Sequence, residues 1–173
     1  MRGGRAEWVI YFVEGQTEKA LLMALQAEKI IPSGKIHIFN CWDGKVESTL
    51  RLMPKSGRVI SYIVFDTDVT SRVDEFVNAV KRIADSSSKV HLLQQTRNLE
   101  EELIHACPGL KLLALHKAFR AQGDESFKNK FIKDKKRLVR LQELGFNVNQ
   151  MWSRGLMPIL KTRLSLQKII IGF

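Results

Sequence analysis

Residues 10–22, IYFVEGQTEKALL, contain the pattern that decides the fold. The apolar run from Val9 to Val13 predicts a buried strand, which stops abruptly at Glu14 and Gly15. Leucines then follow at helical spacing, so a helix is predicted directly after the turn. A carboxylate at the end of a buried strand is unusual. We therefore expect Glu14 to have a role there and to lie close to other carboxylates of the chain.

The strand–helix alternation continues to about residue 106. The most strand-like run is RVISYIVFD at 58–66, which is β-branched, aromatic and uncharged from Val59 to Phe65. Near-continuous apolar strands separated by helices are typical of an α/β fold with a mostly parallel central sheet and helices on both faces. The expected strands are 8–13, 35–40, 58–66 and 90–95; the expected helices are 17–31, 46–53, 71–84 (with Ser71 as N-cap) and 98–106.

The charge divides the chain of 173 residues into two parts. The net charge is +10, yet residues 1–109 hold equal numbers of acidic and basic residues, and residues 110–173 carry the whole excess. We therefore expect an α/β domain over 1–109 and a basic, mainly helical segment over 110–173 packed on it, with helices at 110–119 and 126–146. Residues 168–173 could form a closing strand. The excess charge indicates a surface for a polyanion such as DNA or RNA, or else a solvated basic face.

The candidate nucleic-acid-binding residues lie in the segment SFKNKFIKDKKRLVR. Phe127 and Phe131, which alternate with these cations, are expected in the core and not as platforms for bases. The cations that could contact phosphates are Lys128, Lys130, Lys133, Lys135, Lys136, Arg137 and Arg140.

Asp66 and Asp68 end the strand of residues 58–66, two positions apart, and point to the same side if the chain stays extended. Paired carboxylates repel each other and require a cation or a shared proton, and Mg²⁺ prefers such oxygen ligands. A calcium loop starting at Asp66 fails, because Ser71 and Val77 would occupy its glycine and glutamate positions. The alternative is structural: the two aspartates end a strand and cap a helix.

Strand, Glu14-Gly15, helix and a later strand ending in Asp66-x-Asp68 together resemble the TOPRIM domain of topoisomerases, bacterial primases and several nucleases. The resemblance covers about residues 8–107. It implies that Glu14, Asp66 and Asp68 converge on a divalent metal, Mg²⁺ or Mn²⁺, and that Gly15 lets the chain turn tightly.

Glu18 and the stretch NLEEEL at 98–103 indicate which branch of this family the chain resembles most. The EGxxE form is similar to the nuclease branch typified by the overcoming-lysogenization-defect proteins and their small relatives. There, Glu18 and Glu100 would join the metal ligands, with Glu102 as the second match. Glu18 could equally be an acid favoured by the helix dipole. The absence of a glycine shortly after Asp68 also favours the nuclease branch over topoisomerases and primases.

Arg97 follows the strand of residues 90–95 and could reach the same cleft. An arginine there could stabilise a phosphate in the transition state, so Arg97 is a candidate catalytic residue beside Glu14, Asp66, Asp68 and Glu18. A salt bridge to a neighbouring glutamate is the alternative.

Other patterns exclude several classes of protein. Cys41 and Cys107 stand far apart without metal-ligand spacing and are expected as buried thiols. No GxxxxGK[ST] loop occurs, so any ATPase motor would be a separate partner chain. No apolar stretch is long enough to span a membrane, and MRGGRAEW lacks the apolar core of a signal peptide; we expect a cytoplasmic protein.

Three functions follow from these observations. The first is a metal-dependent nuclease that cleaves phosphodiester bonds, which the resemblance connects with defence against phage or mobile elements. The second is a nucleic-acid-binding module of the same fold without turnover. The third is a subunit that docks on a partner ATPase or an acidic protein.

Overall fold

The computed structural model has a central sheet of five strands, all parallel, in the order β2-β1-β3-β4-β5. The structure describes residues 7–68, 70–164 and 167–173. The strands are β1 (Glu7–Val13), β2 (Lys35–Ile38), β3 (Arg58–Asp66), β4 (Lys89–Gln95) and β5 (Ile169–Ile171). The predicted α/β fold with a parallel sheet is confirmed.

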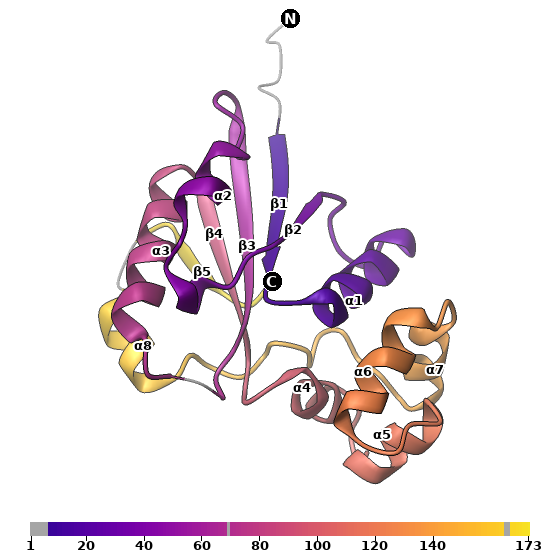
Figure 1. Ribbon diagram of the computed structural model, residues 1–173. Coiled ribbons are helices and arrows are strands. Elements are labelled where there is room, and N and C mark those ends of the chain that lie inside the picture. The colour runs from indigo at the N-terminus through magenta and orange to yellow at the C-terminus, as the bar shows by residue number, and fades with distance from the viewer. Residues whose placement is uncertain (1–6, 69, 165–166) are drawn as a thin grey trace, which may run out of the picture.

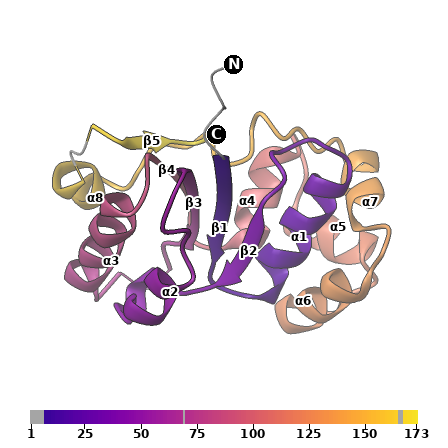
Figure 2. The same ribbon diagram turned by 90° about the horizontal axis from the view of Figure 1, so that it is seen from above.

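Helices cover both faces of the sheet (Figures 1 and 2). One face carries α1, α4, α5, α6 and α7, and the other carries η1, α2, α3 and α8. These elements are α1 (Gln16–Ala27), η1 (Cys41–Asp43), α2 (Glu47–Arg51), α3 (Val73–Asp85), α4 (Leu99–Ala106), α5 (Leu112–Ala118), α6 (Asp124–Lys133), α7 (Arg137–Glu143) and α8 (Pro158–Arg163).

The alternation of side chains along each strand builds two separate hydrophobic cores. In β1, Ile10 and Phe12 pack toward α3, whereas Tyr11 and Val13 pack toward α1. Both sets are almost fully buried, because a parallel sheet with helices on both faces has no solvated side. This arrangement explains why the strands read as continuous apolar runs in the sequence.

The chain reverses its direction across the sheet between β1 and β3. β2 lies on one side of β1, and all later strands lie on the other side. In open parallel sheets such a switch point leaves a crevice at the carboxyl ends of the strands, where ligands bind. Glu14 follows β1 and Asp66 ends β3, so both lie at this switch point.

The part of the chain after residue 109 contributes to both faces and to the sheet. α6 and α7 contact α1, and α5 contacts α4, whereas α8 packs on α3 and β5 pairs with β4. The side-chain amide of Gln94 at the end of β4 accepts a hydrogen bond from Met157 N (2.8 Å) and donates one to Gly155 O (3.1 Å). The boundary predicted at residue 109 is a change in charge, and the sheet takes its last strand from beyond it.

One predicted helix is broken. Residues 126–146 were expected to form a single helix, but α6 ends at Lys133 and α7 begins at Arg137. Asp134 has an extended ψ of 109°, and its carboxylate accepts hydrogen bonds from Lys136 N (2.8 Å) and Arg140 Nε (2.5 Å). These local bonds give the backbone an alternative to a continuous helix.

Two helix ends also differ from the prediction. α1 ends at Ala27, not at residue 31, because Lys29 adopts a left-handed φ of 57°. α3 begins at Val73 with Arg72 at the N-cap position and no side-chain cap, so Ser71 does not cap it.

Cys41 and Cys107 are both buried and free, as predicted. None of the helices within residues 7–68, 70–164 and 167–173 has the length and apolar character needed to cross a lipid bilayer. The segment MRGGRA, residues 1–6, lies outside the described residues, and so does Val69.

Candidate active site

Glu14 and Asp66 meet at the switch point of the sheet. The backbone N–H of Asp66 donates a hydrogen bond to Glu14 Oε1 over 3.1 Å. The indole Nε1 of Trp42 in η1 donates to Asp66 O over 3.0 Å, which fixes the end of β3. The two predicted ligands therefore lie together, although they are 52 residues apart in the chain.

Glu18 lies in the first turn of α1 and folds back on the turn that precedes the helix. Its side chain is buried, with 8% of its surface exposed. A Cβ at Gly15 would lie 3.1 Å from Glu18 Oε2, so the glycine leaves room for this carboxylate. Gly15 itself has extended backbone (φ −151°), so close approach and not an unusual turn conformation accounts for the glycine.

Glu100 and Glu102, both in the first turn of α4, have different environments. Glu102 is fully buried and accepts hydrogen bonds from Trp152 N (2.8 Å) and Thr96 N (3.2 Å), and it pairs with Arg154 Nη2 (2.5 Å). Glu100 is 3% exposed, and neither of its carboxylate oxygens has a partner among the described residues. Glu102 is therefore a structural anchor, and Glu100 is the one available for a ligand.

Asp68 is exposed in the loop after β3, and Arg97 lies in the loop after β4. The two loops are joined by Thr67, whose Oγ1 accepts from Arg97 N (2.8 Å) and whose N–H donates to Arg97 O (3.2 Å). The Arg97 side chain is 74% exposed, and its Nη1 is 3.7 Å from Glu101 Oε1. In the structure, Arg97 therefore forms the salt bridge to a neighbouring glutamate that was the alternative to a catalytic role.

Burial and mutual repulsion raise the pKa of the two central carboxyl groups. The pKa of Asp66 is raised to about 9, mainly by burial and further by the nearby charges of Glu18, Glu14, Asp68 and Glu100. Burial likewise raises the pKa of Glu14 to about 7, against the hydrogen bond from the Asp66 N–H. Without a cation, this site therefore holds protons at neutral pH.

Glu18 and Glu100 form the second half of the same cluster. Burial raises the pKa of both carboxyl groups, and Glu100 adds to the shift at Glu18 by its charge. The positive charge of Lys128 in α6 lowers the pKa of both residues and so opposes the shift. We call Glu14, Glu18, Asp66, Asp68 and Glu100 the carboxylate cluster.

Gln95 is a polar residue of this site that the sequence interpretation missed. It is paired in register with Asp66 on the adjacent strand, so the two side chains leave the sheet on the same face. Gln95 is fully buried, and neither its Oε1 nor its Nε2 has a hydrogen-bond partner among the described residues. The pattern VHLLQQ could have shown it, because a strand that ends in two glutamines is no longer apolar at its carboxyl end.

The donor atoms of the carboxylate cluster fit a hard divalent cation in chemistry. They are carboxylate oxygens, and the buried Asp66 Oδ1 and both oxygens of Glu100 lack partners. Within the described residues, however, no three acidic, histidine or cysteine side chains already converge at the spacing of one metal site. A cation would therefore require rotations of these side chains toward one point.

The predicted nucleic-acid-binding cations differ in their environments. Arg137 donates to three backbone carbonyls, those of Phe131 (2.9 Å), Ile132 (2.7 Å) and Ala20 (3.3 Å), so its guanidinium joins α6, α7 and α1. Arg140 pairs with Asp134 through Nε. The remaining predicted cations are exposed: Lys128, Lys130, Lys133, Lys135 and Lys136.

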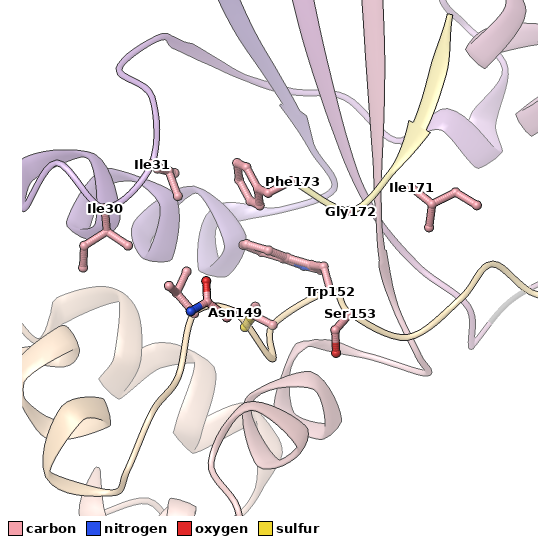
Figure 3. Close-up of a pocket in the computed structure, with 10 residues that line it drawn as sticks. Ile30, Ile31, Asn149, Trp152, Ser153, Ile171, Gly172 and Phe173 are labelled. Carbon is pink, nitrogen blue, oxygen red and sulfur yellow. The ribbon is translucent and has the colours of Figure 1, made fainter. Parts of the chain in front are cut away.

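The hollow drawn in Figure 3 has no residue of the carboxylate cluster in its lining. This cavity of about 320 Å³ lies among the segment after α1, the loop before α8 and the end of the chain, where Trp152 and Phe173 approach each other. It is lined by Ile30, Ile31, Val148, Asn149, Met151, Trp152, Ser153, Ile171, Gly172 and Phe173. Because none of these side chains is an acid, a base or a common metal ligand, we place the candidate chemistry at the carboxylate cluster.

Comparisons with models of known protein families, with curated proteins and with solved structures gave no match to this chain. The candidate site therefore rests on its own geometry and electrostatics.

The shifted carboxyl groups predict an unusual dependence of stability on pH. The pKa values of Glu14 and Asp66 in the folded protein exceed their ordinary values of 4.5 and 3.8, so the metal-free folded state retains protons that the unfolded state releases. The free energy of unfolding should therefore fall as pH rises from about 4 toward 9, by up to about 1.4 kcal/mol per pH unit for each carboxyl group that is protonated only in the folded state. Urea unfolding in EDTA at pH 5, 7 and 9 measures this, and Asp66→Asn should flatten the slope. A wild-type slope equal to that of the variant would contradict the assigned pKa values.

Proposed function

We propose that the chain is a metal-dependent nuclease that hydrolyses phosphodiester bonds at the carboxylate cluster. The observation that carries this proposal is the gathering of acidic side chains at the switch point of the sheet, with buried carboxylate oxygens that lack partners. Such a cluster is unfavourable by itself, since burial and like charges both oppose ionisation. A divalent cation relieves both effects, which is a reason for a chain to keep these acids.

Each member of the cluster has a distinct place in this proposal. Glu14, Asp66 and Asp68 would hold Mg²⁺ or Mn²⁺ from the ends of β1 and β3, and Glu18 and Glu100 would extend the ligand set from α1 and α4. The cation would supply the positive charge that stabilises the phosphate in the transition state and favours ionisation of an attacking water. Lys128, whose charge lowers the pKa of Glu18 and Glu100, would add a positive charge where a phosphate approaches.

Nucleic acid is favoured as the partner because the net charge of +10 comes from residues 110–173, the part of the chain that includes α5 to α7. The resemblance to TOPRIM nucleases supports a cytoplasmic role in defence against phage or mobile elements. An ATPase motor, where one takes part, would be a separate partner chain.

A second candidate is a nucleic-acid-binding module of the same fold without turnover. One observation favours it: among the described residues, no three potential ligands already converge on one point. In this case the protein would bind polynucleotides equally well with and without a divalent cation.

Cleavage assays separate these two functions. Labelled single-stranded and duplex DNA and RNA are incubated with the protein in Mg²⁺, in Mn²⁺ and in EDTA. The nuclease proposal expects cleavage of at least one substrate with either cation and none in EDTA. Binding of a substrate in every condition, with no cleavage in any, would favour the binding module.

A further inference from the structure

A second hollow of about 250 Å³ lies on α6 and is surrounded mainly by cations. It is formed where the end of α5, the end of α6 and the side of α7 meet, and Ala118 and Phe119 contribute its apolar walls. The charged residues that line it are Arg120, Lys130, Lys133, Asp134 and Arg140. Four cations thus surround the hollow with a single carboxylate.

The single carboxylate orients one of the cations and leaves its outer nitrogens available. Asp134 accepts a hydrogen bond from Arg140 Nε over 2.5 Å and another from Lys136 N over 2.8 Å. The two Nη groups of Arg140 have no ion-pair or hydrogen-bond partner within the described part of the chain. A guanidinium held in this way presents a planar pair of donors that matches a phosphate group.

Arg120 is also placed by the backbone. It follows α5 with a left-handed φ of 55°, and the turn is closed by hydrogen bonds from Arg120 N to Lys117 O (3.0 Å) and from Ala121 N to His116 O (2.8 Å). Glycine is the usual residue at such a helix end, because other residues adopt this conformation at a cost. The chain nevertheless has an arginine there, and no carboxylate among the described residues pairs with it or with Lys130 and Lys133.

The hollow and the carboxylate cluster lie on different sides of α6. Lys130 lines the hollow and Lys128 does not, because residues two positions apart in a helix point to nearly opposite sides, and Lys128 is the cation of α6 whose charge lowers the pKa of Glu18 and Glu100. The cations of the hollow are therefore separate from the carboxylate cluster. Of these cations, only Arg140 is paired with an acid of the described residues, Asp134, so the hollow keeps an excess of positive charge.

We propose that Arg120, Lys130, Lys133 and Arg140 form a phosphate-binding site and that it holds a backbone phosphate of the polynucleotide at a distance from the carboxylate cluster. Several converging cations favour a phosphate over a single carboxylate. The identity of the phosphate as part of a polynucleotide rests on the proposed function, but the phosphate site itself requires no cleavage and no metal.

The test uses the full chain in EDTA and the double variant Arg120→Gln/Lys133→Gln, which leaves the Arg140–Asp134 pair intact. The control, Lys45→Gln/Lys55→Gln, removes the same charge from exposed positions near α2. The first probe is inorganic phosphate, followed through the NMR signal of the Arg140 Nε–H. The second is a fluorescent oligonucleotide, single-stranded or duplex, whose affinity is measured at several salt concentrations.

We expect phosphate to shift the Arg140 signal to saturation in wild type and control but not in the double variant. The double variant should also bind the oligonucleotide about fivefold to tenfold more weakly than the control, and its log–log salt slope should be flatter by about 0.7–0.9, the value for one lost phosphate contact. Equal affinities and slopes in the two variants would overturn the polynucleotide assignment, and an unshifted Arg140 signal in wild type would overturn the site.

Two further results keep this inference distinct from the proposed function. Saturation by phosphate in a wild type that binds no oligonucleotide would leave the site in place and remove the proposed function. Displacement of the oligonucleotide by polyglutamate as readily as by pyrophosphate would instead identify an acidic protein as the ligand and overturn the choice of phosphate.

Discussion

Replacing Asp66 with asparagine should abolish metal-dependent cleavage while making the metal-free protein more stable at neutral pH. The amide removes a carboxylate charge from the candidate ligand set but keeps the size of the side chain. Burial and the neighbouring acids raise the pKa of Asp66 to about 9, so the carboxyl group destabilises the folded state near pH 7. We expect a gain on the order of 2 kcal/mol in the free energy of unfolding, equivalent to a rise in Tm of roughly 5 °C.

The matched control for this variant is Asp85→Asn. Asp85 is exposed at the last position of α3 and lies outside the carboxylate cluster. The free energy of unfolding of the Asp85→Asn variant should therefore stay within about 0.5 kcal/mol of wild type, and its cleavage rate should be unchanged. Loss of stability in Asp66→Asn would instead mean that the aspartate is a structural element at the end of β3. Nucleic-acid binding by Asp66→Asn should persist, since a negative charge leaves the place where phosphates approach.

Glu100→Gln and Glu102→Gln should have opposite effects although the residues are two positions apart. Glu102→Gln removes the charge that pairs with Arg154 and weakens a fully used acceptor, so we expect a loss of about 2–4 kcal/mol in the free energy of unfolding. Glu100→Gln removes a buried charge without partners, so stability should stay equal or increase. Its Mn²⁺ affinity should fall by at least about tenfold if Glu100 is a ligand.

These two variants serve as controls for each other, because each replaces one buried glutamate of α4 by the same amide. Thermal unfolding in EDTA measures the stability, and calorimetric titration with Mn²⁺ measures the affinity. A loss of stability in Glu100→Gln, or full stability in Glu102→Gln, would show that the roles assigned from the hydrogen bonds are wrong.

The parallel α/β fold and the position of the carboxylate cluster could be predicted from local patterns. The apolar runs that end at Glu14 and at Asp66 indicate two strands whose carboxyl ends carry acids, and in a parallel sheet these ends share one edge. The end of such a strand can be located in the sequence, because a strand buried on both faces is a continuous apolar run and its first polar residue marks the end.

The roles of single residues depend on partners distant in the chain and could not be read from spacing. Glu102 resembles Glu100 in sequence, but its partners Trp152 and Arg154 lie about 50 residues away. Arg137 looks like any other cation of a basic helix, yet three carbonyl groups occupy its guanidinium. The break between α6 and α7 similarly depends on bonds made by the side chain of Asp134.

The central claim is that the carboxylate cluster binds a divalent cation, and anomalous diffraction from a crystal soaked in Mn²⁺ tests it most directly. The claim predicts an anomalous peak within about 2.5 Å of a carboxylate oxygen of Asp66, with Glu14 or Asp68 as a second ligand. It also predicts that the peak disappears in crystals of Asp66→Asn. A Mn²⁺ peak only at other positions, or none at a concentration that saturates a typical Mn²⁺ site, would contradict the claim.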